Sequence, residues 1–136
     1  MAWPFDSEEQ LDEWVDVYIA AHRQRPETEA DQEAAFLASE PGHVAPYQGH
    51  AEDLWRFILK VIERRPSEWA LGMLAAGPVE DLISTCGCDF INRIEVEARR
   101  NPLFRETLLG VWQNSTPPEL WARVERARGT VTPGNT

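Results

Sequence analysis

Apolar residues recur at three- and four-residue intervals along most of this chain, and that spacing places side chains on one face of an α-helix. The clearest stripe, in residues 7–24, consists of Leu11, Trp14, Val15, Tyr18 and Ile19. A second stripe, in residues 51–65, consists of Leu54, Trp55, Ile58, Val61 and Ile62, widened by Phe57 and Leu59. Because a helix that is apolar on more than one side is surrounded by other elements, we expect residues 51–65 at the centre of the fold.

Residues that favour helix ends divide the rest of the chain into further helices. We expect helices over residues 28–38, 67–76, 78–86 and 89–100, one that begins at Pro102, and one within 115–129. No stretch alternates apolar and polar residues between turn signals, as a half-buried strand does. The sequence therefore predicts an all-α fold of about seven or eight helices, with a single compact domain over residues 5–129 and a disordered tail over 130–136.

Single residues set several of these boundaries. Helix starts are predicted where a side chain can cap the backbone, at Ser7 with Gln10 (or Asp6 with Glu9), Thr28, Asn101, and Thr116 with Glu119. Helix ends are predicted at Gly77, Gly87 and Gly129, since glycine readily adopts positive φ. Pro78 then begins the next helix, where its missing N–H is not needed. Residues 40–50, with two Pro and two Gly, are predicted to form a loop.

Three of the predicted helices end in the same way. Each has arginines before a proline, at Pro26, Pro66 and Pro102, which are 40 and 36 residues apart. These spacings resemble the period of helical-pair repeats, although the segments between the prolines share no signature. A short helical-repeat array is therefore the alternative to a compact multi-helix domain.

The negative charge of the chain is concentrated at one end. The net charge is −10 at pH 7, and residues 1–40 hold eleven Asp or Glu against two Arg. Nucleic acid is not expected as a direct ligand, because phosphate binding rests on Lys and Arg. An acidic face can instead attract a basic protein partner, or can simply be a solvated surface. The residues predicted to bind such a partner are Glu8, Glu9, Asp12, Glu13, Asp16, Glu27, Glu29, Asp31 and Glu33.

The composition is typical of a cytosolic globular protein. Apolar residues make up 43% of 136 residues, which suffices for one core. No run approaches the roughly 20 apolar residues of a membrane span, and the first ten residues lack the basic and apolar regions of a signal peptide. We expect a cytoplasmic location and no membrane contact, and the sequence leaves the oligomeric state open.

Two motifs, one with paired thiols and one with paired carboxylates, are candidate chemical sites, and both have simpler explanations. Cys86-x-Cys88 lacks the second ligand pair that a zinc site needs, and Cys86 fits the buried face of its helix. Glu80 and Asp81 are neighbours on a helix and point about 100° apart, so they do not converge on one site. Both suit the first turn of a helix, where negative charge is favoured. No catalytic residue, metal or cofactor is therefore predicted.

The histidines offer the remaining candidates. His22 lies on the apolar stripe of its helix and is predicted to be a hydrogen-bonded boundary residue. His43 and His50 flank a segment that also leads to Glu52 and Asp53, so residues 43–53 are where a histidine and a carboxylate could cooperate. No nucleophile with a neighbouring base has a recognisable pattern there.

The C-terminal half of the chain resembles an uncharacterised family of small bacterial proteins. The resemblance rests on Trp69, GPVEDLI at 77–83, IEVEARRNP at 94–102 and GVW at 110–112, and it departs at Val79, where the family has Leu. It implies a helical domain of unknown function and bacterial origin, without any activity. The matching residues, to which we assign folding roles, are Trp69, Gly77, Pro78, Glu80, Asp81 and Trp112.

Three functions are compatible with these observations. The first is a cytosolic protein-binding module, in its sharpest form an immunity or antitoxin protein that neutralises a basic toxin with its acidic N-terminal helices. The second is a small hydrolase-like enzyme that uses residues 43–53, for which a cleft with His50 and two carboxylates is required. The third is an accessory domain that assembles with copies of itself or with a larger complex.

Overall fold

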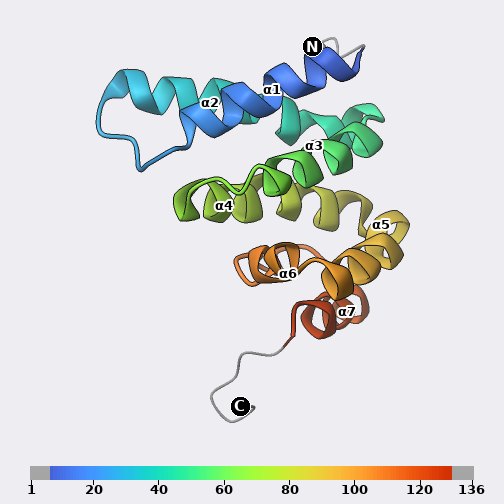
Figure 1. Cartoon of the computed structure of the whole chain (residues 1–136). Coiled ribbons are helices and arrows are strands. Elements are labelled where there is room, and N and C mark those ends of the chain that lie inside the picture. Colours follow the sequence, from blue (N-terminus) through green and yellow to red (C-terminus); the bar gives the residue numbers. More distant parts are fainter. Residues whose placement is uncertain (1–6, 130–136) are drawn as a thin grey trace.

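The computed structural model describes residues 7–129, and its ordered elements in that range are all helices (Figure 1). They are α1 (Glu8–Ala21), α2 (Glu29–Val44), the 3₁₀-helix η1 (Ala45–Gln48), α3 (Ala51–Glu63), α4 (Glu68–Leu74), the π-helix η2 (Ala75–Val79), α5 (Glu80–Arg100), α6 (Pro102–Leu108) and α7 (Pro118–Arg128). The all-α prediction is confirmed. The predicted domain start at residue 5 and the predicted tail at 130–136 lie outside the described residues.

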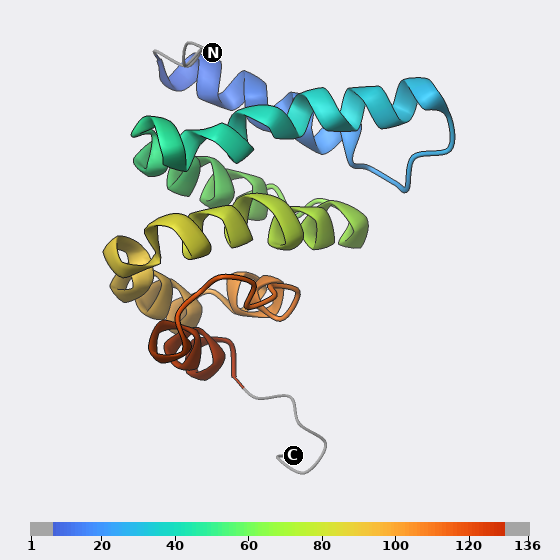
Figure 2. The ribbon, with the colours of Figure 1, turned by 180° about the vertical axis from the view of Figure 1, so that it is seen from behind.

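The helices are stacked in chain order from one end of the molecule to the other (Figures 1 and 2). α1 packs on α2 and α3, whereas α5 packs on α6 and α7 at the opposite end. One cluster of buried apolar residues nevertheless runs through the whole stack, from Leu11 to Val124. The molecule is therefore one helical domain with a continuous core, built as a short stack.

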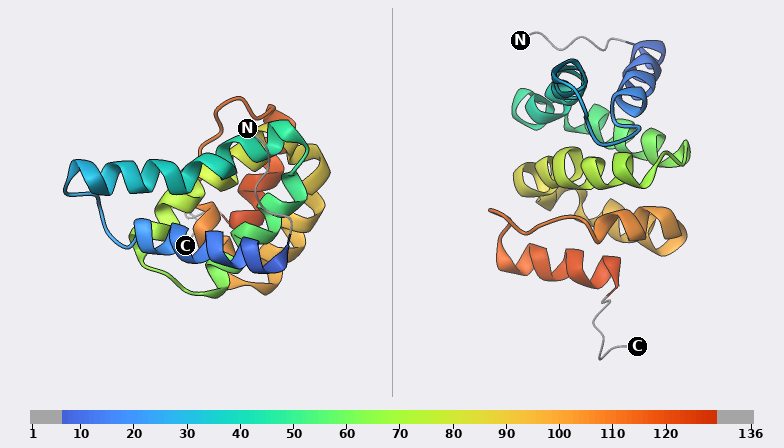
Figure 3. Two further views of the ribbon diagram at one scale, coloured as in Figure 1. Left: turned by 90° about the horizontal axis from the view of Figure 1, so that it is seen from above. Right: turned by 90° about the vertical axis from the view of Figure 1, so that its left-hand side faces the viewer.

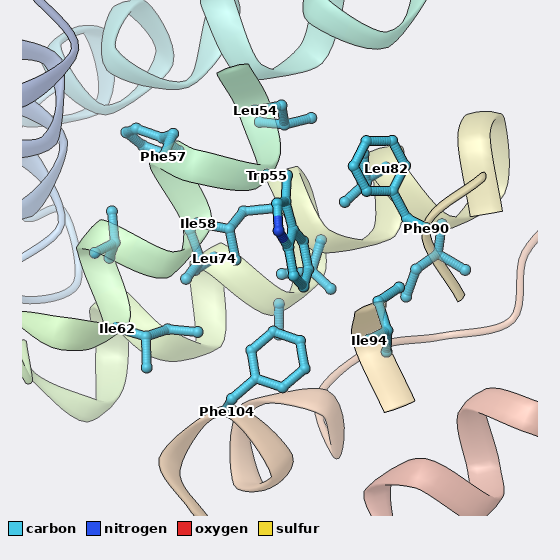
Figure 4. Close-up of a cluster of buried hydrophobic side chains, with 14 of the residues drawn as sticks. Leu54, Trp55, Phe57, Ile58, Ile62, Leu74, Leu82, Phe90, Ile94 and Phe104 are labelled. Atoms are coloured by element: carbon cyan, nitrogen blue, oxygen red, sulfur yellow. The ribbon is translucent and has the colours of Figure 1, made fainter. Parts of the chain in front are cut away.

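α3 lies at the centre of this core, as its wide apolar stripe predicts. Its side chains contact the helices on both sides of it (Figure 4). On one side Phe57 stacks on Trp14 of α1, with ring centroids 3.6 Å apart. On the other side Trp55 lies between Phe90 and Phe104, at 5.9 and 5.7 Å. Burial of a large apolar side chain contributes about 1.5–3 kcal/mol to stability. Because α3 buries such side chains on both sides, it holds the two ends of the stack together.

The predicted break at Gly77 and Pro78 is wrong. α4, η2 and the first part of α5 continue as one helical rod from Glu68 to the kink at Cys86. The Glu80 N–H bonds to the Ala75 carbonyl five residues earlier, and this wider turn gives room to the proline ring inside a helix. Ala75, Pro78 and Val79 are buried. Tertiary packing thus keeps this segment helical, although its local sequence favours a helix end.

The predicted break at Gly87 is present one residue earlier, and Gly87 also has a packing role. Cys86 has the non-helical values φ −128° and ψ 19°, so α5 consists of two helices joined at a kink. Gly87 is buried against α7, where a Cβ atom would lie 2.5 Å from Cδ2 of Leu120. The absence of a side chain therefore lets α5 and α7 approach closely.

The predicted loop at 40–50 is largely helical. α2 continues through Pro41 and Gly42 to Val44, and η1 follows. The indole N–H of Trp14 donates to the Ala38 carbonyl at 2.9 Å, in the turn that contains the proline. Gly42 is buried, and a Cβ atom there would lie within ordinary contact distance of Trp14 and Leu54. Packing on α1 and α3 therefore extends α2 past its helix-breaking residues.

The remaining boundaries divide into confirmed and wrong predictions. Side chains of Ser7, Thr28 and Asn101 cap α1, α2 and α6 as predicted, and Gly129 ends α7 with φ 74°. Thr116 does not cap α7. Its hydroxyl is buried and has no hydrogen-bond partner within the described residues, and Pro117 occupies the cap position.

Candidate functional site

The largest cavity described lies between α1 and α2 and has a volume of about 750 Å³. It is lined by Gln10, Glu13, Trp14, Val17, Ala20, Ala21, Ala34, Leu37 and Ala38, and we call it the α1–α2 groove. Seen from above, the two helices diverge and the first half of α2 projects beyond the stack (Figure 3). The groove is therefore formed where α2 leaves the body of the protein.

Large apolar side chains are exposed at this groove. Val17 and Leu37 line it with 57% and 56% of their surface exposed, and Phe36, next to Leu37 on α2, is 68% exposed. Single exposed apolar residues are common on protein surfaces, whereas a contiguous apolar groove marks an interaction site. Four of the nine lining residues are alanines, whose small side chains leave room for a ligand.

Three of the five acidic residues predicted as a binding face on α1 form ion pairs within the protein. Three carboxylates spaced four residues apart face three cations of α3 with the same spacing, which puts each set on one face of its helix. The pairs are Glu8 with Arg56 and Lys60, Asp12 with Lys60, and Asp16 with Arg64. We call these contacts the α1–α3 ladder. These ion pairs connect α1 with α3.

The other predicted binding carboxylates lie elsewhere. Asp31 accepts the Glu27 N–H at 3.2 Å while Thr28 accepts the Asp31 N–H at 3.0 Å, so Asp31 belongs to a capping box. Glu29 is in the first turn of α2. Glu13 lines the groove, and neither it nor Glu9 and Glu33 forms an ion pair with another described residue. All three are exposed. These three carboxylates are left to attract a cationic ligand.

His22 ties α1 to α2 beside the groove. It is 1% exposed, and its Nδ1 lies 2.9 Å from the Tyr18 carbonyl while Nε2 lies 3.3 Å from Oγ of Ser39. A carbonyl only accepts, so Nδ1 carries the proton and Nε2 accepts from the Ser39 hydroxyl. Burial lowers the pKa of His22, and its bond to Tyr18 opposes this in part. The predicted hydrogen-bonded histidine is confirmed.

The histidines of residues 43–53 form two separate contacts. His43 Nδ1 lies 3.3 Å from Oδ2 of Asp81, and His50 Nδ1 lies 4.0 Å from Oδ2 of Asp53. Burial raises the pKa of Asp81, and the hydrogen bond with His43 lowers it in part. His50 does not line the α1–α2 groove. Within residues 7–129 no group of three His, Cys, Asp or Glu side chains is close enough to hold a metal ion.

Residues of the predicted family motif meet near the π-helix. Glu80 accepts the Trp112 N–H at 3.2 Å and also a hydrogen bond from the Asn114 amide, which fixes the turn after α6. A Cβ on Gly110 in that turn would lie 3.0 Å from Cβ of Ala75. Trp112 itself is 74% exposed and lies beyond α6, which ends at Leu108, so its contribution to this turn is its backbone N–H.

The other motif residues and the two cysteines add no chemical site. Trp69 is partly exposed on α4, and its neighbour Ala70 is buried in its place. Cys86 is partly buried with its Sγ 4.0 Å from the Pro46 carbonyl, and burial raises the pKa of its thiol. Cys88 is exposed, and both thiols are free.

Sequence reasoning located the acidic residues but not the groove. The available signal was weak: Val17 lies off the apolar stripe of its helix, and Phe36-Leu37 follows a run of polar residues and alanines. The ladder was also missed, although its two sets of charges share a four-residue spacing. Only the pairing of α1 with α3 shows which carboxylates remain available.

A family model described as "Family of unknown function (DUF6869)" matches residues 23–131. The match covers α2 to α7 and begins after α1. No curated protein and no solved structure matches the chain. Among the described residues, no helix is long and apolar enough to cross a membrane.

Proposed function

Since the chain belongs to this family of unknown function, we propose its function from its own surface: it is a protein-binding module that holds a basic partner at the α1–α2 groove. The observation that carries the proposal is one groove in which the exposed apolar side chains of Val17 and Leu37 lie with Glu13, a carboxylate that forms no ion pair with another described residue. Apolar contact supplies affinity, and the carboxylates favour encounter with a cationic protein.

In its sharpest form the proposed function is that of an immunity or antitoxin protein in the bacterial cytosol. Such a protein binds one basic toxin and covers its active surface. The strong acidity of residues 1–40 supports a basic target, because like-charged proteins are repelled.

The test is capture of partners from the native host with the tagged chain and two charge variants. The groove variant carries Glu9→Lys, Glu13→Lys and Glu33→Lys, which leaves the α1–α3 ladder intact. The control carries Glu63→Lys, Asp89→Lys and Glu106→Lys, three exposed positions outside the groove with the same change in net charge. We expect one stoichiometric basic partner that the control retains and that the groove variant, or high salt, releases. Equal capture by both variants would contradict the proposal.

A further inference from the structure

The lining of the α1–α2 groove restricts the conformation of what binds there. Its backbone groups belong to two helices and, apart from the last carbonyls of α1, are hydrogen-bonded within them, so the groove offers no sheet edge to an extended segment. An extended chain against Val17 and Leu37 would leave its own N–H and C=O groups without partners next to apolar walls. A helix satisfies its backbone internally and has no such cost.

The size and lining of the groove fit one short helix. Ala20, Ala21, Ala34 and Ala38 form a floor of small side chains, which allows a helix axis to approach closely. The lining runs from Gln10 to Ala21 along α1, which at 1.5 Å per residue is on the order of 16 Å. That length corresponds to about three helical turns.

The negative charge around the groove favours a bound helix with positively charged residues beside its apolar face. Glu13 lies in the lining on α1, and Glu33 lies one turn before Leu37 on α2. A helix with Lys or Arg beside its apolar face would place its cations opposite these carboxylates. A second copy of this chain is a poor occupant, because its N-terminal helices carry the same negative charge.

Resting on the proposed function, we infer that the element bound in the α1–α2 groove is an amphipathic α-helix of the partner, about three turns long, with one apolar face flanked by Lys or Arg. It packs between α1 and α2 as a third helix. Its apolar residues contact Val17 and Leu37 and its cations face Glu13 and Glu33.

Two synthetic 18-residue peptides of identical Leu and Lys content test this inference. One has Leu at the i, i+3, i+4, i+7 positions of a helix. The other has the same number of Leu, placed in strict alternation with Lys. Binding of labelled peptide is measured by fluorescence anisotropy against the full chain, Ala34→Phe and Gln32→Phe. Ala34→Phe fills the groove, whereas Gln32→Phe places the same ring on an exposed position of α2 that does not line it.

We expect the helix-patterned peptide to bind at least tenfold more tightly than the alternating one, and Ala34→Phe but not Gln32→Phe to weaken it by a similar factor. Equal binding of the two peptides, no binding of either, or insensitivity to Ala34→Phe would overturn the inference. A wild-type chain that is dimeric by light scattering while Ala34→Phe is monomeric would assign the groove to a second copy and overturn it as well. Capture of a basic host protein at the groove would still stand if only the peptide pattern failed, so the two proposals fail separately.

Discussion

At the scale of single residues, the surroundings of a side chain decide its role more than its type does. Gly77, Gly87 and Gly129 all favour helix ends, yet only Gly129 adopts positive φ at one. Gly87 follows the kink of α5 without a positive φ and is buried against Leu120. The sequence identified these residues as unusual, but it could not distinguish a glycine needed for a turn from one needed for close packing, because the neighbour comes from a distant helix.

The packing role of Gly87 predicts opposite effects for two glycine-to-alanine changes. Gly87→Ala gains helix propensity but forces Leu120 to shift within the contact of α5 with α7, so we expect a net loss of about 1 kcal/mol of unfolding free energy. Gly72→Ala lies in open space in α4 and should gain about 0.5–1 kcal/mol. Urea denaturation measures both. A Gly87→Ala protein more stable than the wild type would contradict the packing role.

His22 predicts a pH dependence of stability. Burial lowers its pKa below the value of 6.5 of an unperturbed histidine. As pH falls below about 6.5, the unfolded chain binds this proton while the folded chain does not, so the free energy of unfolding decreases until the folded pKa is reached. His22→Gln removes the titration. As the pH falls from 8 to 5, the free energy of unfolding of the wild type should decrease more steeply than that of the variant. Identical pH dependences in the two proteins would rule out this role.

At the scale of elements, helix existence was predictable and helix continuity was not. The stripes of α1 and α3 follow from periodicity alone, since their apolar residues face the core directly. The continuity of α4 with α5, and of α2 beyond Pro41, depends on contacts with other helices that outweigh local preferences. The candidate groove also depends on how helices pack, because it lies between α1 and α2.

The α1–α3 ladder predicts a small, salt-dependent contribution to stability. Lys60 contacts both Glu8 and Asp12, at 2.5 and 2.8 Å, but these carboxylates are largely exposed. Exposed ion pairs contribute about 0–1 kcal/mol each, so loss of both pairs in Lys60→Ala should cost at most about 2 kcal/mol in low salt and less in 1 M NaCl. Asp12→Lys should cost more by placing like charges together, and adding Lys60→Asp should restore part of the loss. Denaturant titration of the three variants measures this, and a salt-independent loss would refute the ladder.

At the scale of the whole molecule, its two ends differ in the use of charge. The acidic N-terminal helices direct one set of carboxylates inward to α3 and leave Glu9, Glu13 and Glu33 at the surface beside exposed apolar residues. In the C-terminal helices, arginines pair with carboxylates of nearby helices, as Arg123 does with Glu95 at 2.6 Å. The account therefore assigns recognition to the end of the stack where α2 projects.

The most direct test of that assignment is quantitative capture from the native host with Leu37→Glu and with Leu109→Glu. Both leucines are large and exposed, at 56% and 42%, and both variants gain one negative charge. We expect Leu37→Glu to capture at least tenfold less of the basic partner and Leu109→Glu to retain it, because apolar contact in the α1–α2 groove is required. If Leu37→Glu captures the partner as well as or better than the wild type, charge alone attracts it, and the groove is not the binding site.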